Sequence, residues 1–236
     1  MATSDTYPSR QRSRPRADYR SRSRVRARRR SLFGGGPAGN EQLTAVTGVI
    51  LLVLFAFIGI TILRIGQMLW LHLFVGVLLV GPVGLKLATT GYRFTRYYTG
   101  SAVYRRKGPP HPMLRILGPF VILTTLGVLF SGLLLLLVGP TSSNLLRLFH
   151  KATFILWLGA MGLHVLGHLA ELPDAVRAVS HEQRRRDDLP GTRGRVIALI
   201  VAMVAGLILA LIFLPDVNVW SHTGLYPAGY AAHLGH

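Results

Sequence analysis

The sequence predicts an all-α integral membrane protein, built from a four-helix bundle and a fifth transmembrane helix. Three observations support the membrane class. Half of the 236 residues are hydrophobic and only 15% are charged, whereas soluble domains have roughly 25% charged residues. Five apolar runs each approach about 20 residues, the length that crosses about 30 Å of hydrocarbon. The basic residues are concentrated between these runs.

Residues 1–40 are expected to be a disordered, cytoplasmic tail rich in Arg and Ser. Eleven of the 27 basic residues lie between Arg10 and Arg30, and a glycine-rich stretch follows them. Such a composition has no apolar periodicity and does not form a core. Arg/Ser tracts can bind nucleic acid, but a basic tail attached to membrane spans is better explained as a topology signal that contacts anionic lipid. We therefore expect the lipid bilayer, rather than nucleic acid, to be its partner.

The apolar runs define five expected spans, at residues 43–63, 68–89, 113–138, 145–169 and 196–214. The first four, within residues 43–170, are expected to form the bundle, with the fifth at its periphery. Short connections at 64–67 and 139–144 make the first and second spans, and the third and fourth, antiparallel neighbours. Residues 171–195 are predicted to be a cytoplasmic loop, and residues 215–236 a solvated or interfacial tail outside the membrane.

The distribution of Lys and Arg predicts the orientation. The N-terminal tail and the connections at 91–111 and 171–195 carry nearly all of these residues. Because positively charged connections stay on the cytoplasmic side, we expect a multi-pass protein of the cell membrane. Its N-terminus would lie in the cytoplasm and its C-terminus outside.

The fourth span contains the residues that we expect to be functional. His150 and His164 lie within it, and His168 follows one turn later. Ionisable side chains at membrane depth are energetically unfavourable and are functional candidates by default. Fourteen residues advance an α-helix by about 21 Å and nearly complete a whole number of turns. His150 and His164 should therefore lie on one face, in opposite leaflets, where each imidazole could ligate haem iron.

His72 in the second span is the expected partner of His150. Both spans are predicted to run in the same direction, and each histidine lies little more than one turn after the start of its span. Two neutral imidazoles at equal depth on facing helices suit bis-histidine ligation of haem. The chain contains no cysteine, which excludes covalent haem attachment and thiolate-ligated iron–sulfur clusters.

This pattern resembles the di-haem cytochrome b family. In that family the second and fourth helices of a membrane bundle each supply two histidines, thirteen or fourteen residues apart, one for each haem. The resemblance covers about residues 43–170 and implies haem b between His72 and His150, in the outer leaflet. It leaves a second, inner haem at His164 open, because this chain has Lys86 fourteen residues after His72, where the family has a histidine.

Lys86 allows three interpretations. Its amine could ligate iron if burial deprotonated it, it could pair with a haem propionate, or it could extend to the membrane interface near the end of its span. We favour the last two, because lysine is a strongly hydrated cation at neutral pH. His164 would then face His111, Lys86 or an open coordination position. His168 could replace His164 as ligand or bond a propionate.

Three basic residues are expected near the outer haem. Arg147 and Lys151 flank His150, and Arg64 should lie close by. They could neutralise haem propionates, or they could anchor the helix ends at the lipid headgroups. The spacing does not distinguish these two roles.

We therefore expect a membrane-embedded b-type cytochrome that transfers electrons through one or two bis-ligated haems, with a quinone or another redox subunit as partner. It would be a non-catalytic electron-transfer protein or a subunit of an oxidoreductase. The spans contain no Asp or Glu, which argues against a proton relay. The alternative is a haem-free membrane anchor or scaffold whose Arg-rich tail recruits a partner. A transporter is a third reading, disfavoured by the lack of internal repeats.

Overall fold

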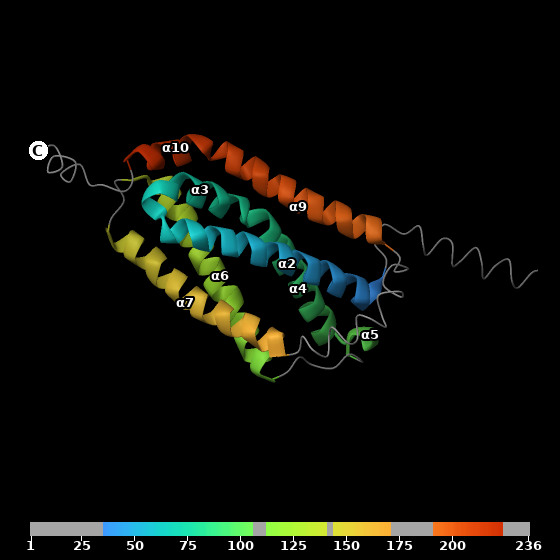
Figure 1. Ribbon diagram of the computed structural model, residues 1–236. Coiled ribbons are helices and arrows are strands. Elements are labelled where there is room, and N and C mark those ends of the chain that lie inside the picture. Colours follow the sequence, from blue (N-terminus) through green and yellow to red (C-terminus); the bar gives the residue numbers. More distant parts are fainter. Residues whose placement is uncertain (1–34, 106–111, 141–143, 171–190, 224–236) are drawn as a thin grey trace, which may run out of the picture.

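The computed structural model describes residues 35–105, 112–140, 144–170 and 191–223 (Figure 1). Among these residues there are helices and connections and no strands. The helices are α2 (Gly36–Leu63), α3 (Ile65–Leu78), α4 (Val80–Tyr98), α5 (Ala102–Arg105), α6 (Pro112–Val138), α7 (Asn144–Ala170), α9 (Thr192–Ile212) and α10 (Leu214–Thr223). Five helical segments, with α3 and α4 counted together, are long and apolar enough to span a membrane. The all-α class is confirmed, and these five segments correspond to the five predicted spans.

Figure 1 shows which helix ends lie together. The turn between α2 and α3 at Arg64, the start of α7 and all of α10 lie at one end of the molecule, which we call the Arg64 end. The starts of α2 and α9 and the short helix α5 lie at the opposite end, which we call the α5 end. The long helices run between these two ends, as membrane spans must.

The first helix begins earlier than predicted. α2 starts at Gly36, inside the segment that was expected to be a disordered tail up to residue 40. Gly35 precedes it with a φ of 97°, and proline occupies the first turn of the helix. Proline is favoured there because the first amide groups of a helix have no partner within it. The Arg/Ser-rich part of the tail lies outside the described residues.

The second span is longer than predicted at both ends. Arg64 alone separates α2 from α3, in place of the expected connection at 64–67, and a local irregularity at Met68 (φ −118°, ψ 19°) bends the start of α3. The span continues as α4 to Tyr98, past the predicted end at residue 89. The helical residues after position 89 are mainly basic and aromatic. Such residues suit a helix that continues beyond the hydrocarbon into the headgroup region. Lys86 therefore lies roughly three turns from the helix end, not within one.

The third and fourth spans form an antiparallel hairpin. α6 and α7 match the predicted bounds to within one residue and pack along each other over most of their length. The indole of Trp157 on α7 donates a 3.0 Å hydrogen bond to the Thr125 hydroxyl on α6. The same indole meets Phe55 of α2 edge-on, with 4.8 Å between the ring centroids. The hairpin thus contacts α2, while a cavity separates α7 from α3.

The fifth span packs closely on the second span, and none of its residues lines the cavity. α9 packs against both α3 and α4. A Cβ atom on Gly81 would collide with the carbonyl oxygen of Ala202, and one on Gly206 with that of Leu78. Because Pro82 has no amide hydrogen, it cannot make the usual helical hydrogen bond to the Leu78 carbonyl. That carbonyl lies against Gly206 instead. Small residues let membrane helices approach this closely. α9 also begins at Thr192, within the loop predicted for 171–195, whose residues 171–190 lie outside the described part.

The segment after the fifth span is not simply a solvated tail. Residues 214–223 form α10, which follows α9 after the single residue Phe213 and packs on α3 and α6. Val217 is fully buried and Trp220 is only 7% exposed. These two apolar side chains, three residues apart, face the bundle. The polar residues around them made the segment resemble a solvated tail in the sequence. Residues 224–236 lie outside the described part.

Candidate functional site

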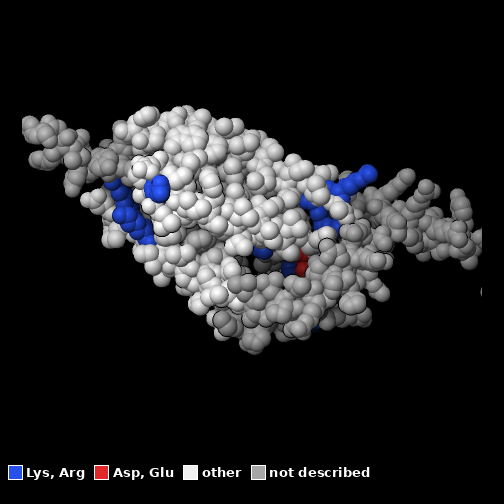
Figure 2. Space-filling view, in the orientation of Figure 1, with Lys and Arg blue, Asp and Glu red and all other residues white. Residues whose placement is uncertain are grey.

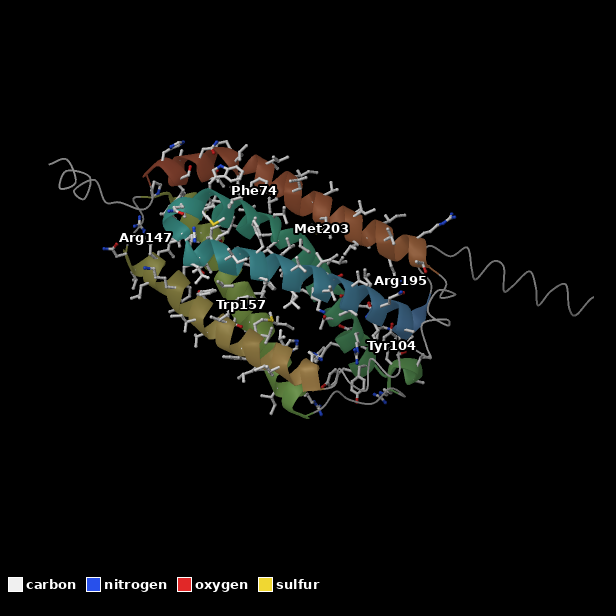
Figure 3. The ribbon with its side chains drawn as sticks, viewed as in Figure 1. Phe74, Tyr104, Arg147, Trp157, Arg195 and Met203 are labelled. Atoms are coloured by element: carbon white, nitrogen blue, oxygen red, sulfur yellow. The ribbon has the colours of Figure 1, made fainter. Side chains whose placement is uncertain are left out.

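An apolar cavity of about 430 Å³ lies between the hairpin formed by α2 and α3 and the hairpin formed by α6 and α7. Its walls come from α2, α3, the first residue of α4, α6, α7 and α10, and its size falls in the range of small-molecule sites. Most of the lining is aliphatic or aromatic, and the ionisable side chains on it are His72, Arg147, His150 and Lys151. Figure 3 shows Arg147 near the Arg64 end of α7, with Trp157 farther along that helix; both line the cavity.

The imidazole of His72 is held by the neighbouring helix. Its Nδ1 lies 3.0 Å from the hydroxyl oxygen of Thr61 on α2. That hydroxyl donates its own hydrogen to the carbonyl oxygen of Ile58, at 2.6 Å. The Thr61 oxygen therefore accepts from the Nδ1–H of His72. The second ring nitrogen, Nε2, keeps its lone pair, and the ring lines the cavity.

His150 is held in the same way within the other hairpin. Its Nδ1 lies 2.9 Å from the hydroxyl oxygen of Ser131 on α6, which donates to the carbonyl oxygen of Val128 at 3.1 Å. Thr153 lies 3.2 Å from the same hydroxyl. A Cβ atom on Gly132 would lie 3.0 Å from Cε1 of His150. Gly132 thus provides the space in which the ring lies.

Each hairpin therefore supplies one histidine together with the hydroxyl that orients it. Histidines that ligate metals in proteins usually donate their other N–H to an oxygen acceptor, which fixes both tautomer and ring direction. Thr61 and Ser131 are both fully buried, so water does not compete for these bonds. Sequence reasoning missed Thr61, Ser131 and Gly132. The role of a hydroxyl or a glycine in an apolar span can be recognised only when the helix packed opposite it is known.

Arg147 lies at the Arg64 end of the cavity. Its Nη2 donates to the carbonyl oxygen of Pro140, and its guanidinium carbon lies 5.5 Å from the ring centroid of Trp220. Its Nε is buried and has no hydrogen-bond partner among the described residues. Lys151 lines the cavity one turn farther along α7. A buried donor beside a second cation suits a ligand with an acidic group at this end.

The cavity residues could hold a haem b. Two neutral imidazoles with available Nε2 atoms suit its iron, the aliphatic and aromatic walls suit its macrocycle, and Arg147 with Lys151 suit its propionates. Among the described residues, no three His, Asp or Glu side chains come together. The arrangement is therefore a pair of imidazoles on an apolar cavity, which suits a metal that brings its own equatorial ligands.

Lys86 lies apart from this cavity. Its amine donates a 2.8 Å hydrogen bond to the Thr44 carbonyl oxygen on α2. A Cβ atom on Gly48 would lie 2.9 Å from the Lys86 nitrogen, so Gly48 makes room for the amine. The expected extension toward the membrane interface is not the orientation observed, because the helix continues well past Lys86 and α2 offers a nearer acceptor.

His164 and His168 also lie outside the cavity lining. Their rings meet edge-on, with 4.7 Å between centroids. The Nδ1 atom of His164 is buried without a hydrogen-bond partner among the described residues, and Lys86 is close enough to act on His164 electrostatically. His111, the other candidate opposite His164, lies outside the described residues. The structure thus brings together His72, His150 and Arg147, and it keeps Lys86, His164 and His168 separate from them.

Comparison with family models, curated proteins and solved structures gave no match. The resemblance to the di-haem cytochromes b therefore rests on the histidine pattern, and the function must be argued from the geometry of the cavity.

Proposed function

We propose that the chain is a membrane-embedded b-type cytochrome that holds one haem b between His72 and His150 and transfers electrons through it. One observation carries this proposal. Two imidazoles from separate hairpins line a single apolar cavity, and each has its Nδ1 fixed by a fully buried hydroxyl. Interhelical hydrogen bonds of this kind also occur in ordinary membrane helix packing, so the support for the proposal comes from both rings lining the same cavity.

The chain's own residues define the role of the haem. Haem supplies reversible one-electron chemistry at its iron. His72 and His150 would both hold its iron, a ligand set that favours electron transfer over the binding of small molecules such as oxygen. The cavity walls would exclude water, and Arg147 with Lys151 would neutralise the propionates. This role suits an electron-transfer protein or an oxidoreductase subunit, with a quinone or another redox subunit as partner.

The distribution of charge supports a place in the bilayer. On the face shown in Figure 2, basic side chains gather at the two ends of the molecule, and the described surface between them is uncharged except in one recess. Apart from Lys86, the described basic residues of α4, α5 and the starts of α6 and α9 are Arg93, Arg96, Arg105, Arg115, Arg193 and Arg195. With the N-terminal tail, they make the α5 end the more basic one. By the positive-inside rule, we place the α5 end in the cytoplasm of a cell-membrane protein and the cavity in the outer leaflet.

The arrangement favours one haem over two. A second haem at His164 would need a ligand opposite it, and Lys86 is the residue at that depth. The Lys86 amine already donates a hydrogen bond to the Thr44 carbonyl of α2 and lies next to Gly48. A donor held by a backbone carbonyl in this way is poorly placed to offer a lone pair to iron.

The proposal is tested by the optical spectrum of the detergent-purified chain, produced with sufficient haem. We expect reduced-minus-oxidised bands of b type, strongly reduced in His72→Ala and in His150→Ala. The matched control is His168→Ala, which removes an imidazole of the same helix that lies outside the cavity. A folded, colourless wild-type protein would support the haem-free anchor instead.

A further inference from the structure

The last described helix closes the cavity at the Arg64 end. The Trp220 ring belongs to the cavity lining, and its Nε1–H donates a 3.2 Å hydrogen bond to the Leu136 carbonyl oxygen of α6. Val217, one turn earlier, is fully buried in the same core cluster. α10 is thereby attached to the helix that carries the hydroxyl anchor of His150.

Two further contacts attach α10 to the other walls. The Nε1–H of Trp70 on α3 donates a 2.9 Å hydrogen bond to the Asn218 side-chain oxygen, and the Trp70 ring stacks on Phe74 with 5.1 Å between centroids. From α7, the Arg147 guanidinium lies over the Trp220 ring, a favourable cation–π arrangement. α10 therefore bridges α3, α6 and α7, the three helices that carry the histidines and Ser131.

α10 is also the wall that can move most readily. It has ten residues, compared with 28 in α2 and 27 in α6 and α7. It follows α9 after one residue, while α9 has its own close packing on α4 through Gly81 and Gly206. Undocking α10 would separate Val217 and Trp220 from the core and leave the five spans in place. Short elements with few buried side chains open at the lowest free energy in a protein.

We propose that α10 is the closing wall of the ligand cavity: Trp220 covers its Arg64 end, positions Arg147, and sets how slowly the bound cofactor leaves. This inference rests on the proposed function, because the cofactor is taken to be haem b. α10 docks after the cofactor has entered, and its contacts with Leu136, Trp70 and Arg147 then resist release. Trp220 is a positioning residue and a barrier, and it is not an iron ligand.

The test is the rate at which haem passes from the loaded full-length protein to an excess of apomyoglobin. We expect Trp220→Ala to accelerate this transfer about tenfold or more, equivalent to the loss of about 1.4 kcal/mol of barrier. Trp220→Phe, which keeps an aromatic ring and loses the N–H donor, should have a smaller effect in the same direction. His222→Gln is the matched control, because it changes an exposed side chain on the same helix, and it should release haem at the wild-type rate.

Trp70→Phe provides a second, milder test. It leaves Trp220 in place and breaks the hydrogen bond to Asn218, so we expect faster transfer even if Trp220→Ala fails to accumulate with haem. In the haem-free wild-type protein, amide hydrogens of residues 214–223 should exchange faster than in the loaded protein. Unchanged transfer rates in Trp70→Phe and the Trp220 variants, with equal exchange in the two forms, would overturn the inference. A wild-type protein that binds no haem would instead overturn the proposed function.

Discussion

The Nδ1 atom of His150 lies 2.9 Å from the hydroxyl oxygen of Ser131, and this contact determines which nitrogen of the imidazole is available to a ligand. The Ser131 hydroxyl also lies 3.1 Å from the Val128 carbonyl oxygen, and when it donates there it accepts from the ring. The pair of Thr61 and His72 repeats the arrangement in the other hairpin. The orientation of both rings is thus fixed before any ligand enters, which lowers the entropic cost of binding.

Removing the hydroxyl anchors should weaken haem binding without removing the ligands. In Ser131→Ala and Thr61→Val the imidazole loses its acceptor, and we expect haem affinity to fall about 10- to 100-fold, the usual effect of losing such a partner. Haem titration of the haem-free protein measures this change. Thr124→Val is the control, since that hydroxyl bonds only to its own helix backbone. Equal affinities in all four proteins would show that the hydroxyls do not orient the ligands.

Gly132 should be required for the position of the His150 ring. A valine there would place its Cβ about 3.0 Å from Cε1 of the imidazole, so the ring must turn away from the cavity. We expect Gly132→Val to lose most of its haem while the helical content, measured by circular dichroism, is preserved. Gly118→Ala on the same helix adds a Cβ in open space and should retain haem. Full haem content in Gly132→Val would contradict the observed ring position.

The crossing of α4 and α9 should be sensitive to a single methyl group. Gly81→Ala places a Cβ against the backbone of α9, and we expect the free energy of unfolding to fall by about 1–3 kcal/mol, as for other overpacked contacts. Thermal unfolding in detergent measures the change. Gly84→Ala lies on the same helix with open space around it and should be close to neutral. Equal stability of the two variants would mean that α9 is not in backbone contact with α4.

Lys86 should be dispensable for the haem between His72 and His150. Lys86→Gln removes the cation and alters the bond to Thr44, but it changes no residue of the cavity lining. We expect the same haem bands and the same ratio of haem to protein as in the wild type. Loss of a second spectral component in this variant would instead implicate Lys86 in a second haem site, together with His164.

The sequence predicted the membrane class and the meeting of His72 with His150, because hydrophobic length and helical period determine depth and face. It did not predict the anchors Thr61 and Ser131, since their value depends on the helix packed opposite. The distance of Lys86 from the end of its helix was predicted wrongly, because basic and aromatic residues after position 89 resemble a loop although they continue the helix to Tyr98. Trp220 and Leu136 are 84 residues apart in the sequence, and Gly81 and Gly206 are separated by an even longer stretch. Local sequence patterns therefore could not predict how α10 and α9 pack.

We propose that His72 and His150 together hold one haem. The most direct measurement is the electron paramagnetic resonance spectrum of the oxidised protein, with the haem content of the same sample. We expect one haem per chain with a low-spin bis-imidazole signal, loss of that signal in His72→Gly and in His150→Gly, and its recovery when free imidazole is added. A wild-type protein without haem, or a low-spin signal unchanged in both glycine variants, would contradict the account.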